Sequence, residues 1–280
     1  MRHVLVVANE TAASRALIER LRERAQDEEI RITVVAPVNR PSEGYVVYED
    51  TRRAAAGRRI DRTLAALREA GVPAQGMVMD CESPDEAVRD ALNTIEPRPD
   101  EIILSTHPLQ KSGWLRRNAL DRVRAAAGDL PVEHVVVERA GDDIETNVLV
   151  IANETVVGEP LLARIRERAA KGPTSFLIIC PQSDPSQGAH PEAERRLRLA
   201  LTSLRGAGID AHGQVAHPDP YTAALHAVRD ERTDEIIVGT FPEERGSSWL
   251  GGGLIEKLQK ETKLPVEHVV VEPERAEVGS

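Results

Sequence analysis

The chain has 280 residues, of which 41% are hydrophobic and only 2% aromatic, and its formal net charge is −10. This length fits about two domains with aliphatic cores, and the acidic balance excludes a protein that binds nucleic acid through bulk electrostatics. No apolar run approaches the roughly 20 residues of a membrane span, and two unpaired cysteines without a secretory segment predict a cytoplasmic location.

The first half of the chain alternates strands and helices. Residues 3–8 form a continuous apolar run, which is typical of a strand buried on both faces, and residues 12–26 place leucines at helical spacing. Gly71 and Gly128 each end a helix, Pro84 opens one, and turn-forming residues over 41–48 predict a loop. The predicted strands are 3–8, 30–36, 73–79, 101–105 and 132–138, and the predicted helices are 12–26, 50–70, 84–93 and 114–127.

The second half repeats the first. Residues 130–138 return unchanged as residues 264–272, and residues 4–11 return as residues 148–155 with one substitution. The chain is therefore two copies of one domain. We predict domains over 1–140 and 147–280, a linker over 141–146, and an α/β fold with helices on both faces of each parallel sheet. The predicted strands of the second copy are 147–152, 174–180, 210–216, 235–239 and 266–271, and its helices are 157–170, 191–206, 219–230 and 252–262.

A glycine loop follows the fourth strand of the second copy. It begins at Gly239 and ends at Gly252 and Gly253. In the first copy, Ser105 and Asn118 are the same number of positions apart as Gly239 and Gly252. This spacing, with the order of strands and helices, resembles the universal stress protein family, twice and over nearly the whole chain. The resemblance implies two Rossmann-like domains with strand order 3-2-1-4-5. It also implies a site for ATP where the carboxyl ends of strands 1 and 4 meet, with glycines that let backbone N–H groups approach phosphates.

Both copies depart from the family's motif, which is Gly-x-x-Gly, nine residues and Gly-Ser or Gly-Thr. Pro242 replaces the second glycine, and the acidic residue that ends strand 1 in the family is Asn9 here, or Asn153 in the second copy. An asparagine can form hydrogen bonds but carries no charge. We therefore expect ATP or AMP to bind weakly or not at all, and more readily in the second copy. The candidate cofactor-binding residues are Asn153, Thr155, Gly239, Thr240, Gly252, Gly253, Asn9, Thr11, Ser105 and Asn118.

Several of these residues have a purely structural alternative. Asn or Thr between a strand and a helix is an ordinary N-cap, and the glycines at 251–253 mark either close approach of a ligand or a flexible helix entry. Trp114 and Trp249 are read as plugs over the sheet end, with base stacking as the lesser alternative. We interpret Arg116 and Arg117 as side chains exposed to solvent, and His107 as a loop residue without a special role. Cys81 is interpreted as a buried, unreactive thiol.

No catalytic or metal-binding cluster recurs between the copies, so we predict no catalytic residues and no metal. The first interpretation is a non-enzymatic nucleotide-binding, ligand-binding or stress-signalling protein. The alternative is a structural or protein-interaction scaffold without a nucleotide, and a weak ATPase or nucleotidyl transferase is the least favoured class. The expected partners are a small nucleotide, no nucleic acid and no membrane.

The unchanged phrase at 130–138 and 264–272 falls on the fifth strand of each copy. The resemblance implies that domains pair through this strand, so we predict an intramolecular pseudo-dimer with a ten-stranded sheet, to which further copies of the chain can add. Alternate residues of a strand share one face, and opposite charges stabilise cross-strand pairs. The predicted pairs are Val136 with Val270, His134 with Glu272 and Glu138 with His268.

Overall fold

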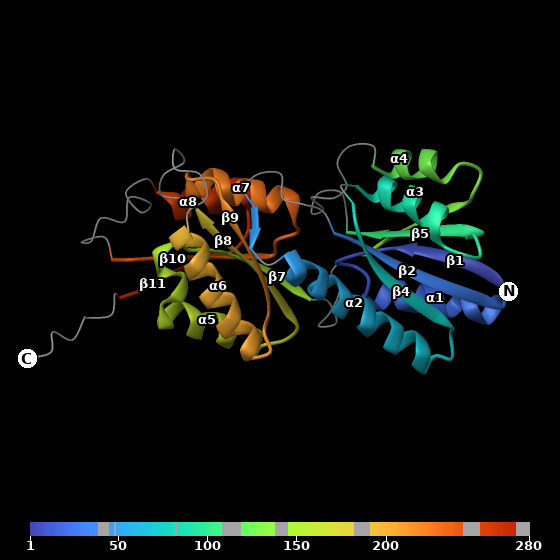
Figure 1. Cartoon of the computed structure of the whole chain (residues 1–280), viewed down its shortest axis with the longest axis horizontal. Helices are drawn as coiled ribbons and strands as arrows, with labels where there is room; N and C mark the ends of the chain where they lie inside the picture. The colour runs from blue at the N-terminus through green and yellow to red at the C-terminus, as the bar shows by residue number, and fades with distance from the viewer. Residues whose placement is uncertain are drawn as a thin grey trace, which may run out of the picture. The chain divides into compact units, whose positions relative to one another are not determined.

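The computed structural model describes residues 1–38, 45–47, 49–81, 83–107, 119–137, 145–181, 191–242 and 253–272. The chain divides into two compact units (Figure 1). Unit 1 comprises residues 1–40 and 50–145, and unit 2 comprises residues 41–49 and 146–280.

Unit 1 contains five parallel strands. They are β1 (Arg2–Val7), β2 (Ile30–Val38), β4 (Ala74–Asp80), β5 (Glu101–Thr106) and β6 (Val132–Val136). The sheet order is β4-β2-β1-β5-β6, so Val6 at the centre pairs with Val34 on one side and Ile103 on the other. Counted along unit 1, this is the predicted order 3-2-1-4-5.

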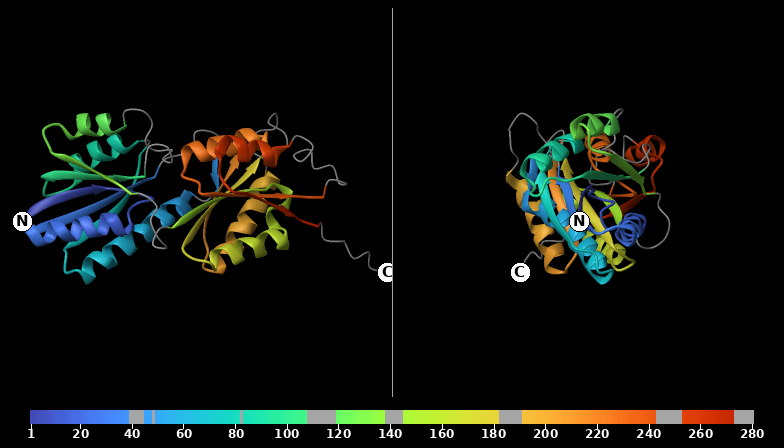
Figure 2. Two further views of the ribbon diagram at one scale, coloured as in Figure 1. Left: turned by 180° about the vertical axis from the view of Figure 1, so that it is seen from behind. Right: turned by 90° about the vertical axis from the view of Figure 1, so that its right-hand side faces the viewer.

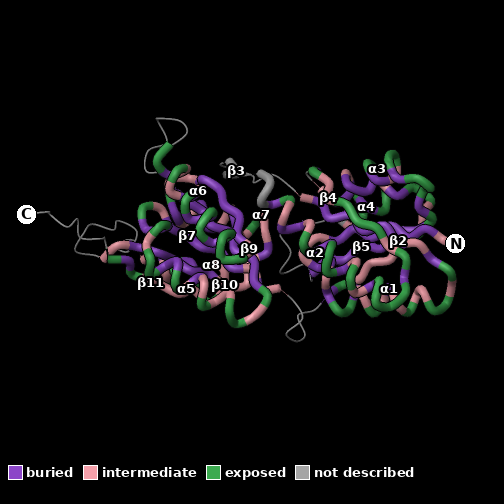
Figure 3. Tube along the Cα trace, turned by 60° about the horizontal axis from the view of Figure 1, so that its bottom comes forward, coloured by how far each residue is buried: buried purple, intermediate pink, exposed green. Residues whose placement is uncertain are grey.

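Four helices cover the two faces of this sheet. They are α1 (Arg15–Asp27), α2 (Glu49–Glu69), α3 (Pro84–Thr94) and α4 (Ala119–Ala127). Leu17 of α1 and Ile60 of α2 pack in one apolar cluster with alternate residues of the central strands. Val88 of α3 and Val123 of α4 pack in a second cluster with the remaining residues of those strands. Because helices pack on both faces of the sheet, the central strands are buried over almost their whole length (Figure 3).

The ends of the helices follow local chemistry. The hydroxyl of Ser14 accepts a hydrogen bond from the backbone N–H of Leu17 and so caps α1. Pro84 begins α3, as predicted. Gly71 has a φ of +73°, a left-handed conformation that glycine adopts without steric cost, and its N–H bonds the carbonyl of Arg68.

Unit 2 repeats this plan. Its parallel strands are β7 (Thr146–Ile151), β8 (Thr174–Pro181), β9 (Asp210–Ala216), β10 (Glu235–Thr240) and β11 (Val266–Val270). Its helices are η1 (a 3-10 turn, Glu154–Val157), α5 (Glu159–Ala169), α6 (Pro191–Gly206), α7 (Pro220–Asp230) and α8 (Leu254–Thr262). Helices α5 and α6 cover one face of the sheet and α7 and α8 the other (Figure 2).

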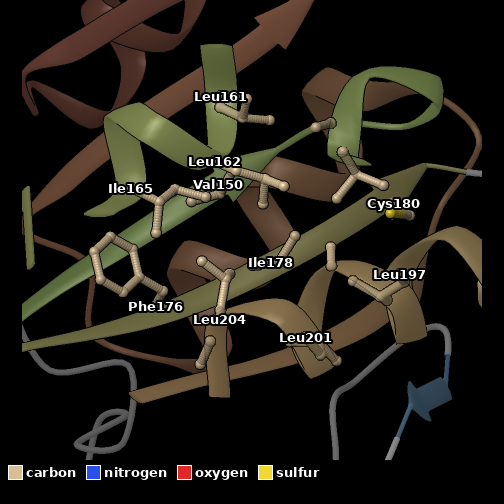
Figure 4. Close-up of a cluster of buried hydrophobic side chains, with 14 of the residues drawn as sticks. Val150, Leu161, Leu162, Ile165, Phe176, Ile178, Cys180, Leu197, Leu201 and Leu204 are labelled. Carbon is tan, nitrogen blue, oxygen red and sulfur yellow. The ribbon is translucent and has the colours of Figure 1, made fainter. Parts of the chain in front are cut away.

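The larger core of unit 2 lies between its sheet and helices α5 and α6 (Figure 4). Phe176 of β8 is fully buried there, beside Ile165 and Leu204. Most of the other members are Val, Leu, Ile and Ala. This composition agrees with the expectation that aliphatic side chains fill the cores.

A sixth strand, β3 (Tyr45–Val47), joins the sheet of unit 2, although it comes from the first half of the sequence. It pairs antiparallel with β9, with Val46 opposite Gln214, and the sheet order becomes β11-β10-β7-β8-β9-β3. In Figure 1 it is the short blue arrow among the yellow and orange elements. The prediction of a loop over 41–48 is therefore wrong at these three residues.

The described strands form two sheets, one in each unit, with β6 and β11 as the outermost strands. The pairing of these two strands in one ten-stranded sheet stays a prediction, as do the pairs of His134 with Glu272 and Val136 with Val270, because each unit is described by itself. Glu138, predicted opposite His268, lies outside the described residues.

Contacts within each unit give a structural reason why the segment at 130–138 is repeated at 264–272. Glu133 accepts two hydrogen bonds from the guanidinium of Arg20, at 2.5 and 3.2 Å, and Glu267 accepts two from Arg164, at 2.5 and 2.7 Å. Each pair ties the fifth strand to the first α-helix of its unit, and such two-pronged pairs are geometrically specific. The same internal contacts, made twice, are a physical reason for the sequence identity that does not require a seam between the copies.

Candidate functional site

The candidate residues gather where the first and fourth strands of each unit end. Parallel strands end at the same edge of a sheet, so the loops after β1 and β5 meet in unit 1, and those after β7 and β10 meet in unit 2. Thr11 donates its hydroxyl to the carbonyl of Ser105 at 3.0 Å, and Thr155 donates to the carbonyl of Gly239 at 2.8 Å. The structure thus brings together, in matching geometry, the predicted residues of each copy.

The two threonines are buried and lock one loop onto the other. Their hydroxyl protons are used inside the protein. The N-cap alternative is wrong for them, because Ser14 caps α1 and Gly158 occupies the N-cap position of α5. Asn153 precedes the 3-10 turn without a capping hydrogen bond from its side chain.

Gly239 lies in a closely packed place. A Cβ added at this position would lie 2.8 Å from Cδ2 of Leu161 and 3.3 Å from the hydroxyl oxygen of Thr155. Contacts this short force a neighbour to move. Its counterpart in unit 1 is Ser105, whose buried hydroxyl oxygen has no hydrogen-bond partner in the described part of the chain.

The two asparagines that end the first strands both bind arginines. Asn9 accepts a hydrogen bond at Oδ1 from Nη1 of Arg59 at 3.1 Å, and its Nδ2 donates to the carbonyl of Pro37 at 2.8 Å. Asn153 accepts at Oδ1 from Nη2 of Arg196 at 2.8 Å. The amide oxygen that the resemblance assigned to a nucleotide is therefore occupied by a guanidinium in both units.

In unit 1 this arginine also holds an internal carboxylate. Nε of Arg59 donates to Oε2 of Glu145 at 2.7 Å, and Nη2 of Arg62 donates to Oε1 at 2.9 Å. The side chains of Arg59 and Glu145 are each only 8% exposed. Burial alone would raise the pKa of Glu145, but Arg59 and then Arg62 outweigh it and hold that pKa below its ordinary value.

Thr240 lies on the fourth strand of unit 2 and bonds to the fifth. A hydrogen bond of 2.7 Å joins its hydroxyl to Nε2 of His268, and the matching bond in unit 1 joins Thr106 to His134 at 2.8 Å. Burial, followed by the charge of Arg124, lowers the pKa of His134 and so favours the neutral ring. Thr240, like Thr155, therefore serves the interior of its own unit.

The remaining candidates belong to the helix that follows the fourth strand. Gly253 adopts a left-handed conformation, with φ +63°, directly before α8. The described residues do not include Gly252, Asn118, Trp114, Trp249, Arg116 or Arg117.

Other reactive groups are engaged or buried. His107 is buried, with Nδ1 3.2 Å from the carbonyl oxygen of Val137. Within the described ranges, no group of three or more His, Cys, Asp and Glu side chains could hold a metal ion. None of the helices that the structure describes is long and apolar enough to cross a membrane.

We expect both thiols to be unreactive in the native protein. Cys81 and Cys180 are free and buried, and burial is the main reason that the pKa of each lies at about 12. Because the thiolate is the nucleophile, Ellman's reagent at mildly alkaline pH should release product only after denaturant is added. Rapid labelling of either native thiol, assigned with a Cys81→Ser variant, would contradict this expectation.

Sequence reasoning missed three residues of this region. They are Arg59, Arg196 and Glu145. The two arginines meet the asparagines only in the folded units, and Glu145 meets Arg59 across 86 positions of the chain. The only available signal was that two arginines occupy equivalent positions of the duplicated helix.

The chain was compared with family models, curated proteins and solved structures. No family model and no curated protein matches the chain. A solved structure from the universal stress protein family of Burkholderia pseudomallei is similar, with 21% identity, 48% of this chain and 94% of that chain covered, and a TM-score of 0.37. A universal stress protein from Archaeoglobus fulgidus matches 98% of this chain and 97% of its own at 16% identity, with a TM-score of 0.36. The fold is described by the structure itself: each unit contains five parallel strands in the order 3-2-1-4-5, which is the order that the resemblance implied.

Proposed function

We propose that this chain is a non-enzymatic binding or signalling protein of the universal stress protein kind, in which ATP or AMP binds weakly or not at all. The observation that carries the proposal is that both strand-end asparagines accept hydrogen bonds from arginines. In unit 1 the amide nitrogen of Asn9 is also used, by the carbonyl of Pro37. A nucleotide that used these asparagines would have to break contacts that are part-buried, and leaving a buried donor unpaired costs about 1–3 kcal/mol.

Unit 2 is the better place for a ligand. No hydrogen bond of the Asn153 amide nitrogen is found in the described part of unit 2, and Gly253 stands at a helix N-terminus, where backbone N–H groups favour anions. Unit 1, with both polar atoms of the Asn9 amide engaged and Glu145 held by two arginines, is the degenerate partner.

Calorimetry with ATP and AMP, each with and without magnesium, tests the proposal. We expect no binding or millimolar binding at one site per chain. At a ligand concentration equal to its dissociation constant, stabilisation is only about 0.4 kcal/mol, so the melting temperature should hardly move. Micromolar binding at two sites per chain would overturn the proposal.

A second candidate function, an interaction scaffold, is favoured by the outer edges of the two sheets. Val136 on β6 and Val270 on β11 are 45% and 46% exposed. The N–H groups of the next residues, Val137 and Val271, point inward to the carbonyls of Thr106 and Thr240. The N–H groups of Val136 and Val270 therefore point outward, and an outermost strand with free N–H groups can pair with a second copy of the chain.

We expect a Val136→Pro, Val270→Pro double variant to abolish such self-association. Proline is tolerated where the N–H of an edge strand faces outward, so the internal ladder should survive. Sedimentation velocity should give a concentration-dependent dimer for the natural chain and a monomer for the variant. Val136→Thr, Val270→Thr keeps the N–H groups and serves as the control. A natural chain that stays monomeric at high concentration would remove this candidate.

A further inference from the structure

Arg59 and Arg196 occupy equivalent places in the two units. Each donates to the asparagine at the end of its unit's first strand. The neighbouring residues, Ile60 and Leu197, also correspond, since each would touch a Cβ added at the matching glycine of the third parallel strand, Gly76 or Gly213. The two arginines therefore occupy corresponding positions, although Arg59 reaches its asparagine through Nη1 and Arg196 through Nη2.

The surroundings of the two Nε atoms also differ. Nε of Arg59 donates to the carboxylate of Glu145, which Arg62 also binds. Nε of Arg196 is buried and has no hydrogen-bond partner in the part of the chain that the structure describes. Leu199, which is 56% exposed, stands where unit 1 has Arg62.

The acid on the same helix does not replace the missing partner. Glu192 lies 3.7 Å from Nη1 of Arg196, and its side chain is 88% exposed. A pair so exposed contributes little. A buried guanidinium N–H without an acceptor is costly, and guanidinium groups match carboxylates in shape and charge.

We propose that unit 2 binds a small free carboxylate at Nε of Arg196, as unit 1 holds the side chain of Glu145. The amide nitrogen of Asn153, which corresponds to the nitrogen that Asn9 donates to Pro37, supplies a second donor. A carboxylate is preferred over a phosphate because one arginine carries one positive charge. The proposal rests on the assignment of ligand binding to unit 2 but requires no nucleotide.

The side-chain Nε–H signal of Arg196, followed by NMR during titration with sodium acetate at constant ionic strength, tests the inference. We expect a saturable shift of this signal with millimolar affinity, and no saturable response in Arg196→Gln. Arg195→Gln removes the same charge from the adjacent, exposed position and should bind acetate like the natural chain. Equal loss of binding in both variants would overturn the proposal, because it would indicate general charge attraction.

Leu199→Arg provides a test that does not depend on removing a buried contact. It places a second guanidinium where Arg62 binds Glu145 in unit 1, and it should tighten acetate binding about fivefold or more. No saturable shift in either the natural chain or this variant would refute the site. Separate titrations use inorganic phosphate and AMP in place of acetate. If phosphate binds more tightly than acetate, the preference for a carboxylate is refuted. If AMP binds tightly, the proposed function is refuted, and the acetate titration still decides on the carboxylate site separately.

Discussion

Replacing Glu145 with glutamine is expected to lower the free energy of unfolding by about 3–5 kcal/mol at neutral pH, the usual cost of removing one partner of a buried ion pair. The carboxylate of Glu145 binds Arg59 and Arg62, and glutamine would remove this buried negative charge from both guanidinium groups. Urea unfolding of the natural chain and the variant measures the difference.

The effect should depend on pH in a defined direction. The pKa of Glu145 is lower in the folded chain than its ordinary value of 4.5. The carboxylate therefore contributes its full stability above about pH 4.5, and the contribution is lost as the pH falls through the folded pKa. When the measurement is repeated at decreasing pH, the free energies of unfolding of the natural chain and of Glu145→Gln should become equal.

A control variant separates this effect from general charge removal. Glu192→Gln removes an exposed carboxylate from the weak pair with Arg196 and should leave stability unchanged. A constant difference between the natural chain and Glu145→Gln across the whole pH range would show that packing, and not ionisation, causes the loss.

Phe176→Ala should cost about 3–5 kcal/mol, the range for truncating a large buried aromatic side chain. Phe176 is among the largest of the fully buried side chains, and it packs among aliphatic neighbours in the core between the unit 2 sheet and helices α5 and α6 (Figure 4). Phe241, the second phenylalanine of the chain, is only partly buried, so Phe241→Ala is the matched control and should cost less.

Hydrogen exchange can locate this loss. The core around Phe176 contains only unit 2 residues, whereas separate clusters stabilise unit 1. We therefore expect amides of β7 and β8 to lose protection by about a hundredfold or more, with amides of β1 and β2 unchanged. Equal loss in both sets would show that the two cores unfold as one cooperative unit.

The parallel strands and most helices could be predicted because their signals are local or repeated. The apolar run over residues 3–8 corresponds to β1, and Gly71 ends a helix with the expected left-handed conformation. The strand order came from the family resemblance, and the structure confirms it in both units. Three-residue β3 was missed, because three residues in a turn-rich stretch carry no measurable periodicity.

The positions of the candidate residues at the strand ends could be predicted, but their hydrogen-bond partners could not. The asparagines and threonines lie at the strand ends where the resemblance placed them, yet each is bound by a distant residue of its own unit. The pairing of the fifth strands stays a prediction. The identical segment that suggested it also makes contacts inside unit 1, where Glu133 binds Arg20 and His134 binds Thr106.

Strand β3 has a practical consequence for cutting the chain into fragments. A fragment that begins at residue 147 contains every parallel strand of unit 2 but lacks Tyr45–Val47. Its outermost strand on that side would be β9, with a row of unpaired backbone groups, which is a known cause of aggregation. The boundary of the duplicated sequence is therefore not the boundary of the second folded body, and an expression fragment of that half should carry residues 41–49 on a flexible tether.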